Sequence, residues 1–182
     1  LKRLKKAGAI AIGYGIESGS QKVLDRMNKK INIRQAERAL NDTIRSKIFP
    51  VIFMMYGYPG ESLESLQETV EFFKKVPYVG RIHFAITTAL PGSELYNDCL
   101  KEGLIKDENR YLESLAAGFT ANGNRLIINF TQFSKWDFWR LKSELERKIY
   151  LEQIKRYPRH FITITFKRYI FALRECLQKL FN

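Results

Sequence analysis

Residues 13–29 have the sequence GYGIESGSQKVLDRMNK, in which an apolar run stops abruptly and a helical pattern begins. The run covers residues 9–16 and is nearly continuous, which is typical of a strand covered on both faces of a parallel sheet. It ends in Glu17-Ser18-Gly19-Ser20, which offers a carboxylate, two hydroxyls and a flexible glycine. Because ligands bind at the carboxyl ends of strands in parallel α/β proteins, this pattern predicts a binding site there.

The chain repeats this arrangement twice. A second apolar run at residues 49–56 ends in the turn sequence GYPGES of residues 57–62, and a helical pattern follows. A third run at residues 81–88 ends in TTALPGS, residues 87–93, again before a helical pattern. Strands that alternate with helical crossovers predict an α/β fold with a parallel sheet and right-handed connections. The polar strand ends are then expected to form one ligand-binding rim.

After Gly103 the pattern becomes mainly helical. A short strand is expected at residues 125–130, and a long helix at residues 134–157 counts Trp136 and Trp139 among its apolar positions. Capping boxes are expected at Asn32 with Gln35 and at Ser134 with Asp137. The other helices are expected to end near residue 6, to follow Ser20, Asn32 and Ser62, and to cover residues 93–103, 108–117 and 160–180.

The composition is that of an ordinary globular protein, with 45% hydrophobic and 27% charged residues in a chain of 182. No apolar run approaches the roughly 20 residues that a membrane span needs, and the start lacks the layout of a signal peptide. Cys99 and Cys176 lie too far apart for a local metal or redox motif, and they provide no disulfide framework. These features predict a protein of the reducing cytoplasm.

The net charge of +12 is unevenly spread. Residues 1–60 carry +8, residues 61–134 carry −3 and residues 135–182 carry +7. One interpretation is a set of solvated helix faces. The alternative function is an RNA-binding or membrane-surface module that acts through its basic tail by weak contact with a polyanion or an anionic membrane. A long apolar edge strand would in addition favour self-association through the edge of the sheet.

The three strand-end motifs together resemble one family. Residues 15–29, 57–62 and 90–96 are similar, in this order, to the fourth, fifth and sixth strand regions of radical S-adenosylmethionine (SAM) enzymes. The nearest subgroup is the cobalamin-binding branch that includes the anaerobic Mg-protoporphyrin IX monomethyl ester oxidative cyclases. The resemblance implies that residues 1–103 form the C-terminal half of a partial (β/α)6 TIM-like barrel, and that residues 104–182 form a mainly helical C-terminal extension.

The chemistry implied by the resemblance needs a 4Fe-4S cluster held by a CxxxCxxC motif. The cluster cleaves SAM reductively to a 5′-deoxyadenosyl radical, which abstracts hydrogen from a small-molecule substrate. The sequence lacks this motif, and Cys99 and Cys176 cannot replace it. We therefore expect a fragment of an iron–sulfur oxidoreductase that is inactive alone. Its partner would be the missing N-terminal half of the same protein, which would supply the cluster and any cobalamin site.

The resemblance also implies which residues contact the cofactor. Glu17 and Ser18 are expected to bind the ribose or the methionine end of SAM, and backbone near Leu90 is expected to contact the adenine. Gly57, Pro59 and Gly60 would let the backbone approach the adenine. No catalytic residue and no metal ligand is assigned.

Each of these residue types also has a structural explanation. Glu17 fits a salt bridge at the rim, while Ser18 and Ser20 fit helix caps. The glycines at positions 57 and 60 fit a simple turn, and Glu61 in the first turn of its helix would be stabilised by the helix dipole. Tyr14, Tyr56 and Tyr58 are interpreted as packing residues, and His83 as a core or rim histidine whose hydrogen bonds are satisfied.

Overall fold

The computed structural model describes residues 1–77, 81–118 and 125–158. Its fold is α/β, with three parallel strands in one open sheet, which confirms the fold class and is consistent with part of a TIM-like barrel and a helical extension. In chain order the elements are α1 (Lys2–Lys6), β1 (Ala11–Glu17), α2 (Gln21–Arg26), α3 (Ile33–Arg45), β2 (Phe49–Tyr56), α4 (Leu63–Lys75), β3 (Arg81–Ile86), α5 (Glu94–Lys101), α6 (Glu108–Gly118) and α7 (Lys135–Arg156).

The strands lie in the order β1-β2-β3, so each is beside its neighbour in sequence. Gly15 of β1 is opposite Phe53 of β2, which in turn is opposite His83 of β3. The register of β1 shifts between Gly15 and Glu17, and Glu17 has a positive φ of 72°. A bulge of this kind bends the strand and redirects the side chain at its end.

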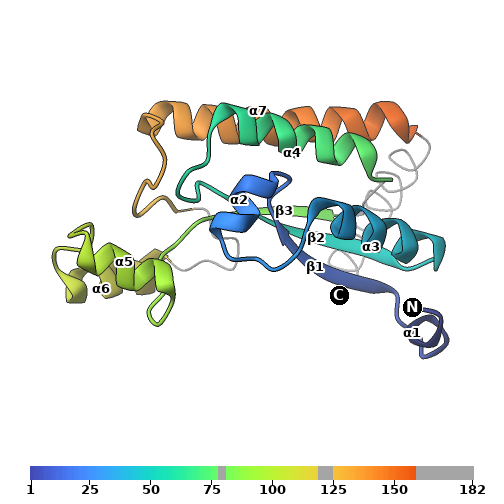
Figure 1. The fold of residues 1–182 in the computed structure, drawn as a ribbon, viewed down its shortest axis with the longest axis horizontal. Helices are drawn as coiled ribbons and strands as arrows, with labels where there is room; N and C mark the ends of the chain where they lie inside the picture. The colour runs from blue at the N-terminus through green and yellow to red at the C-terminus, as the bar shows by residue number, and fades with distance from the viewer. Residues whose placement is uncertain (78–80, 119–124, 159–182) are drawn as a thin grey trace, which may run out of the picture.

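Helices cover one face of the sheet. Figure 1 shows α3, α4 and α7 stacked on the same side of the strands. The side chains that enter this core alternate along each strand, as a period of two requires. They include Ile16 of β1, Ile52, Met54 and Tyr56 of β2 and Ile86 of β3.

The opposite face of β1 is exposed, which corrects the expectation of a strand covered on both sides. Ala11, Gly13 and Gly15 point away from the helices and are all exposed. The apolar run therefore alternates between large residues that enter the core and small ones that do not. Its continuity in sequence came from alanine and glycine, which count as apolar without needing burial.

Local capping explains where several helices begin. The capping box of Asn32 and Gln35 is present at α3, as predicted, and a second box joins Ser62 and Ser65 at α4. Ser134 caps α7 by accepting from the Asp137 N–H, while the Asp137 carboxylate accepts from the Ser134 hydroxyl instead of reaching the backbone.

Residues 125–130 form an irregular loop, so the strand expected there is wrong. Its apolar side chains are divided between two cores: Leu126 packs on the main one, and Ile127, Ile128 and Phe130 pack on a smaller one around α5 and α6. A strand bonded into the sheet could not serve two separate clusters in this way.

Trp136 was also placed wrongly, because it is 72% exposed. The face of α7 that meets α4 is set by Phe138, Leu145 and Ile149, which turns Trp136 outward. The expected helix at residues 160–180 lies outside the described residues. Among the helices that the structure describes, none is long and apolar enough to cross a membrane.

Candidate functional site

The carboxyl ends of the three strands meet at one edge of the sheet, because the strands are parallel. Glu17 and Ser18 follow β1 there, and the glycine turn of residues 57–60 follows β2. Leu90 comes four residues after the end of β3. The ends are staggered, since Glu17 is opposite Met54 and not the last residue of β2. The structure thus gathers the expected residues on one rim, with Glu17 set back from it along the sheet.

Glu17 adopts a conformation that is uncommon for a residue with a side chain. Its φ of 72° lies in the left-handed region, which disfavours most side chains and often marks a functional position. Its carboxylate Oε1 lies 3.0 Å from Lys29 Nζ, and the Glu17 side chain is 20% exposed. The expected rim salt bridge is therefore present, with Lys29 as its partner.

The Glu17–Lys29 pair lies over Gly15 on the open face of the sheet. A Cβ built on Gly15 would lie 2.6 Å from Glu17 Oε1 and 3.4 Å from Lys29 Nζ. Any side chain at this position would therefore displace the carboxylate. Sequence reasoning quoted Lys29 as part of a motif but gave it no role. Its distance of 12 residues from Glu17, across α2, offers no local signal that the two charges meet.

An aromatic pair lies beside these charges on the same face. Phe53 is opposite Gly15, and its ring stacks on the His83 ring with centroids 5.3 Å apart and planes at 14°. Phe53 is 46% exposed. Burial and the positive charge of Arg81 lower the pKa of His83, which favours its neutral form. The open face thus presents an ion pair next to an exposed aromatic surface.

The turn after β2 is held by its own carboxylate. Gly57 and Gly60 have φ of 85° and 84°, which only glycine adopts freely. Glu61 Oε2 accepts from the Gly57 N–H at 2.7 Å, and the Glu61 N–H donates to the Tyr58 carbonyl at 3.0 Å. Burial raises the pKa of Glu61 to about 7, and the bond from Gly57 opposes this rise.

Glu61 is not in the first turn of α4, because Ser62 is the residue that caps that helix. The interpretation through the helix dipole is therefore wrong. Glu61 instead turns back toward the strand and closes the glycine turn. The signal in the sequence was a glutamate four residues after a glycine that must turn, but the burial of that glutamate depends on tertiary packing.

The hydroxyls at the strand ends face inward. Ser18 is buried, and its Oγ accepts from the Ser20 N–H at 3.1 Å. Ser20 begins α2, but its side chain makes no capping bond. Within the described ranges, the buried hydroxyls of Ser20 and Thr87 have no hydrogen-bond partner. Ser18 is therefore engaged in a local turn, and the interpretation of Ser18 and Ser20 as side-chain helix caps is wrong.

Among the expected site residues after β2 and β3, Leu90 and Gly60 are exposed, Pro59 is half-buried and Gly57 is buried. Leu90 is exposed, but its carbonyl accepts from the Ser93 hydroxyl and N–H. Pro59 is half-buried, and Gly60 lies against Arg26, whose Nη1 would be 2.6 Å from a Cβ at that position. The turn after β3 is thus shaped by Ser93, while β2 presents its glycine turn beside Arg26.

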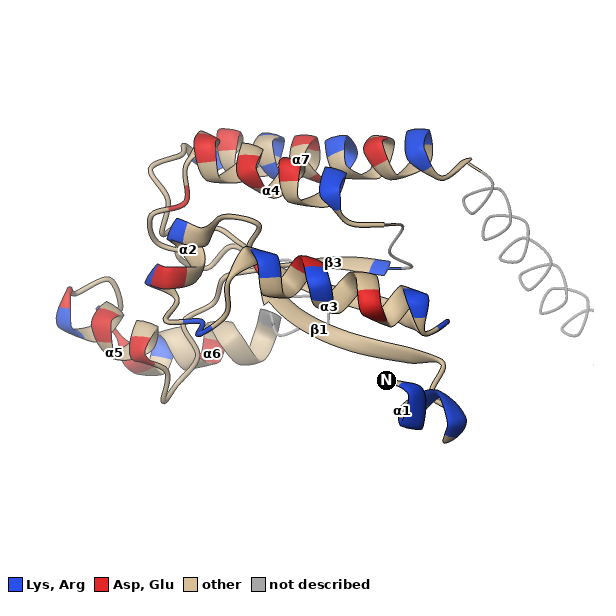
Figure 2. Ribbon diagram, turned by 45° about the vertical axis from the view of Figure 1, so that its right-hand side comes forward, with Lys and Arg blue, Asp and Glu red and all other residues tan. Residues whose placement is uncertain are grey.

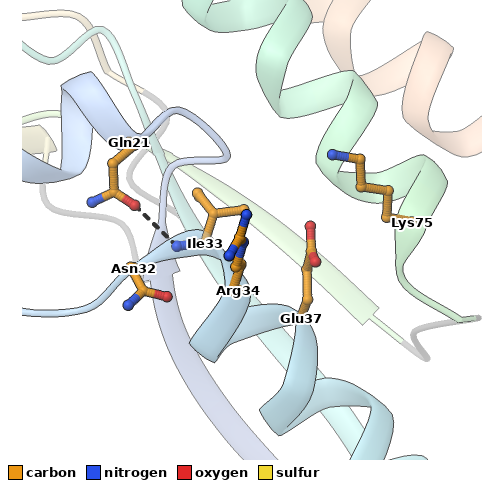
Figure 3. A pocket seen from close by; sticks show the side chains of 6 residues that line it. All are labelled: Gln21, Asn32, Ile33, Arg34, Glu37 and Lys75. Atoms are coloured by element: carbon orange, nitrogen blue, oxygen red, sulfur yellow. Dashed lines mark hydrogen bonds between the residues drawn. The ribbon is translucent and has the colours of Figure 1, made fainter.

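A pocket of about 450 Å³ lies away from these strand ends. Figure 3 shows its lining side chains at the start of α3 and near the end of α4, where the Gln21 side chain accepts from the Ile33 N–H. None of the expected site residues lines it. Its residues are Gln21, Asn32, Ile33, Arg34, Glu37 and Lys75.

The described residues do not fit a 4Fe-4S cluster. Cys99 is buried in the smaller core among Tyr96, Tyr111 and other side chains, and burial raises the pKa of its thiol. Cluster ligation needs accessible thiolates from several cysteines. In the ranges that the structure covers, no group of three or more His, Cys, Asp or Glu residues could hold a metal ion.

The basic charge is concentrated on surface helices. Figure 2 shows Lys and Arg along α1 and interspersed with acidic residues on α3, α4 and α7. On α7 several basic side chains pair with carboxylates of the same helix, which is typical of a solvated face. Much of the basic tail, residues 159–182, lies outside the described residues.

Comparisons with known proteins found a family and several relatives to which part of this chain is similar. Residues 1–73 match the sequence model of the radical SAM superfamily. An uncharacterised methyltransferase of Pyrococcus horikoshii is 27% identical over 108 residues, which is 59% of this chain and 23% of the relative. A cytidylyl-2-hydroxyethylphosphonate methyltransferase of Streptomyces wedmorensis is 27% identical over 115 residues, 59% of this chain and 21% of the relative.

A third relative is a tRNA-2-methylthio-N(6)-dimethylallyladenosine synthase of Clostridium beijerinckii. It is 32% identical over 117 residues, which is 60% of this chain and 25% of the relative. The chain therefore spans about a quarter of the length of the curated relatives it matches.

Proposed function

We propose that the open sheet face of this chain forms one wall of a SAM site in a radical SAM oxidoreductase, because residues 1–73 match the sequence model of that superfamily. In such enzymes, SAM supplies a 5′-deoxyadenosyl radical when a 4Fe-4S cluster reduces it. This chain would hold the methionine, ribose and adenine side of SAM. It would not hold the cluster.

The observation that carries the proposal is the Glu17–Lys29 pair over Gly15. The methionine end of SAM carries one ammonium and one carboxylate, so a neighbouring carboxylate and ammonium match it charge for charge. Lys29 and Glu17 are both accessible, with side chains 36% and 20% exposed. Their mutual bond can therefore be exchanged for bonds to a zwitterionic ligand without uncovering a buried charge.

The small residues of β1 support the same assignment. Gly13 and Gly15 have no side chains, which leaves room over the strand for the Phe53 ring and for the Glu17–Lys29 pair that would receive the ligand. The exposed ring of Phe53 fills part of the space over Gly13, where a Cβ would lie 3.0 Å from it. The adenosine part of SAM would then lie toward the glycine turn and Leu90, because Gly60 and Leu90 are exposed after β2 and β3.

The ligands of the cluster would come from another part of the same protein. Two observations support this: the chain has two cysteines, one of them in a buried core, and it spans about a quarter of its relatives. On this proposal the chain alone binds SAM weakly and does not cleave it.

Binding of SAM to the chain by isothermal titration calorimetry tests the proposal. Replacing Lys29 by Met removes the ammonium and should weaken binding about tenfold or more, since hydrogen bonds to charged groups contribute about 1.5–3 kcal/mol. Lys30→Met is the matched control, because Lys30 is the exposed neighbour of Lys29 in the same loop.

A second ligand separates charge matching from a general loss of structure. 5′-Methylthioadenosine keeps the adenosine and lacks the amino-acid end, so its affinity should be the same in wild type and in the Lys29→Met variant. Equal weakening of both ligands, or equal affinities in the Lys29→Met and Lys30→Met variants, would show that the ion pair does not receive the methionine end.

A further inference from the structure

We propose that α7, acting through Phe138, holds the glycine turn after β2 in the shape that contacts the cofactor. Phe138 is then a positioning residue, because it acts through Gly57 and not on the ligand. The inference rests on the proposed function for the role of the turn. It concerns a helix that lies outside residues 1–73, the part matched by the family.

The Phe138 ring occupies the space where a side chain at position 57 would be. Phe138 is 0% exposed, and a Cβ on Gly57 would lie 2.6 Å from its Cε2 and 2.8 Å from its Cζ. The same ring meets Tyr56 edge to face, with centroids 4.7 Å apart and planes at 68°. The backbone at residues 56 and 57 therefore rests directly on α7, and a smaller side chain at 138 would leave it room to move.

A hydrogen bond also joins the end of β2 to α7. The Tyr56 hydroxyl donates to the Phe138 carbonyl at 2.9 Å. Burial, followed by the charge of Glu61, raises the pKa of Tyr56, so the hydroxyl keeps the proton that it donates. The Tyr56 carbonyl in turn accepts from the Thr87 N–H at 2.8 Å, which joins this point to the end of β3.

The helix itself is anchored at a distance from the turn. Leu145 and Ile149 are buried in the main core, and Gln153 Nε2 donates to the Phe73 carbonyl of α4 at 3.2 Å. Figure 1 shows α7 running along α4 over most of its length. The packing of α7 on α4 therefore fixes the position of Phe138. Phe138 in turn fixes the position of the glycine turn that packs against its ring.

Glu61 holds the turn from the other side. Its carboxylate accepts from the Gly57 N–H, so protection of this amide against hydrogen exchange reports whether the turn is closed. Because Phe138 and Glu61 contact the same glycine, a loss of the Phe138 ring should open the turn more than it destabilises the sheet.

Native-state hydrogen exchange followed by NMR tests this, with the Gly57 amide compared with the amide of Ile52 in the middle of β2. Phe138→Leu should reduce protection at Gly57 by about tenfold more than at Ile52, which corresponds to loss of one hydrogen bond. Ile149→Val is the matched control on the same helix, and it should change both amides equally. Equal effects of the two variants on the Gly57 amide would overturn the proposal.

Two further measurements keep the outcomes distinct. Should Phe138→Leu fail to fold, Tyr56→Phe removes only the hydroxyl bond to α7 and should also expose the Gly57 amide selectively, while no selective effect would overturn the proposal. Affinity for S-adenosylhomocysteine should fall about tenfold in Phe138→Leu and stay unchanged in Ile149→Val. A wild-type chain that does not bind this nucleoside would contradict the proposed function, while the exchange measurement would still decide the role of α7.

Discussion

Replacing Glu61 by Gln should remove a pH dependence from the stability of the chain. Glu61 is 8% exposed, and its carboxylate accepts from the Gly57 N–H at 2.7 Å. Burial raises its pKa from 4.5 to about 7. Glutamine retains an oxygen that can accept from Gly57 and has no proton to lose, so it reproduces the protonated form of the side chain at every pH.

The sign and size of the effect follow from the two pKa values. The unfolded chain loses the Glu61 proton near 4.5, and the folded chain loses it near 7. Between these values the unfolded state binds fewer protons, so the free energy of unfolding falls as the pH rises. The shift corresponds to about 3 kcal/mol, a cost absent below the lower pKa and complete above the higher one. In the glutamine variant this fall is missing.

Urea unfolding of both proteins at several values between about pH 5 and about pH 8 measures this difference. Subtracting the two curves cancels the titration of groups that both proteins share, such as His83. Near Glu61, Tyr56 does not titrate in this range, because the ordinary pKa of tyrosine is 10.0 and burial raises the pKa of Tyr56 further. As the pH rises, we expect the free energy of unfolding of the Glu61→Gln variant to increase relative to that of wild type by up to about 3 kcal/mol.

The control is Glu64→Gln, since Glu64 is exposed in the first turn of α4, and its difference from wild type should not grow with pH. A difference for Glu61→Gln that is constant over the range would refute the reasoning. The reasoning would also be refuted if wild type became more stable than the variant as the pH rises. That result would mean that the site stabilises the ionised carboxylate of Glu61.

Two other changes test how the rim and α7 are built. Gly19→Ala places a Cβ 2.5 Å from the Thr69 Cα, a backbone atom that cannot move aside easily. The free energy of unfolding should therefore fall by about 1–3 kcal/mol or more. An unchanged urea midpoint would contradict this contact. Ser134→Ala removes the side chain that accepts from the Asp137 N–H and should cost about 1 kcal/mol in urea unfolding, whereas Ser143→Ala on the exposed middle of α7 should cost nothing; equal effects would show that the cap does not contribute.

The order of helices and strands could be predicted because its signals are local. The second strand was predicted over residues 49–56, the bounds of β2, since the apolar run there has a proline near its start and ends at a glycine turn. The start of α3 was predicted from Asn32 and Gln35, whose side chains and backbone satisfy each other within one turn.

What could not be predicted depends on register and on helix rotation. Gly15, Phe53 and His83 lie in one row because two strand pairings bring them together, and no spacing in the sequence encodes those pairings. The meeting of Lys29 with Glu17 depends in addition on the bulge that turns Glu17 back over the sheet. Trp136 was misplaced because the apolar residues of α7 are spread around the helix, so the sequence does not show which of its faces meets α4.

The two faces of the sheet carry different properties of the molecule. The large buried side chains of the main core lie on the face covered by α3, α4 and α7, so substitutions there act on stability. The open face holds the strained Glu17 and an accessible ion pair, and exposed pairs contribute only about 0–1 kcal/mol to folding. Loss of Lys29 should therefore weaken ligand binding while it leaves the free energy of unfolding nearly unchanged. Phe138 joins the two faces, since it is buried in the core on one side and supports the glycine turn of the rim on the other.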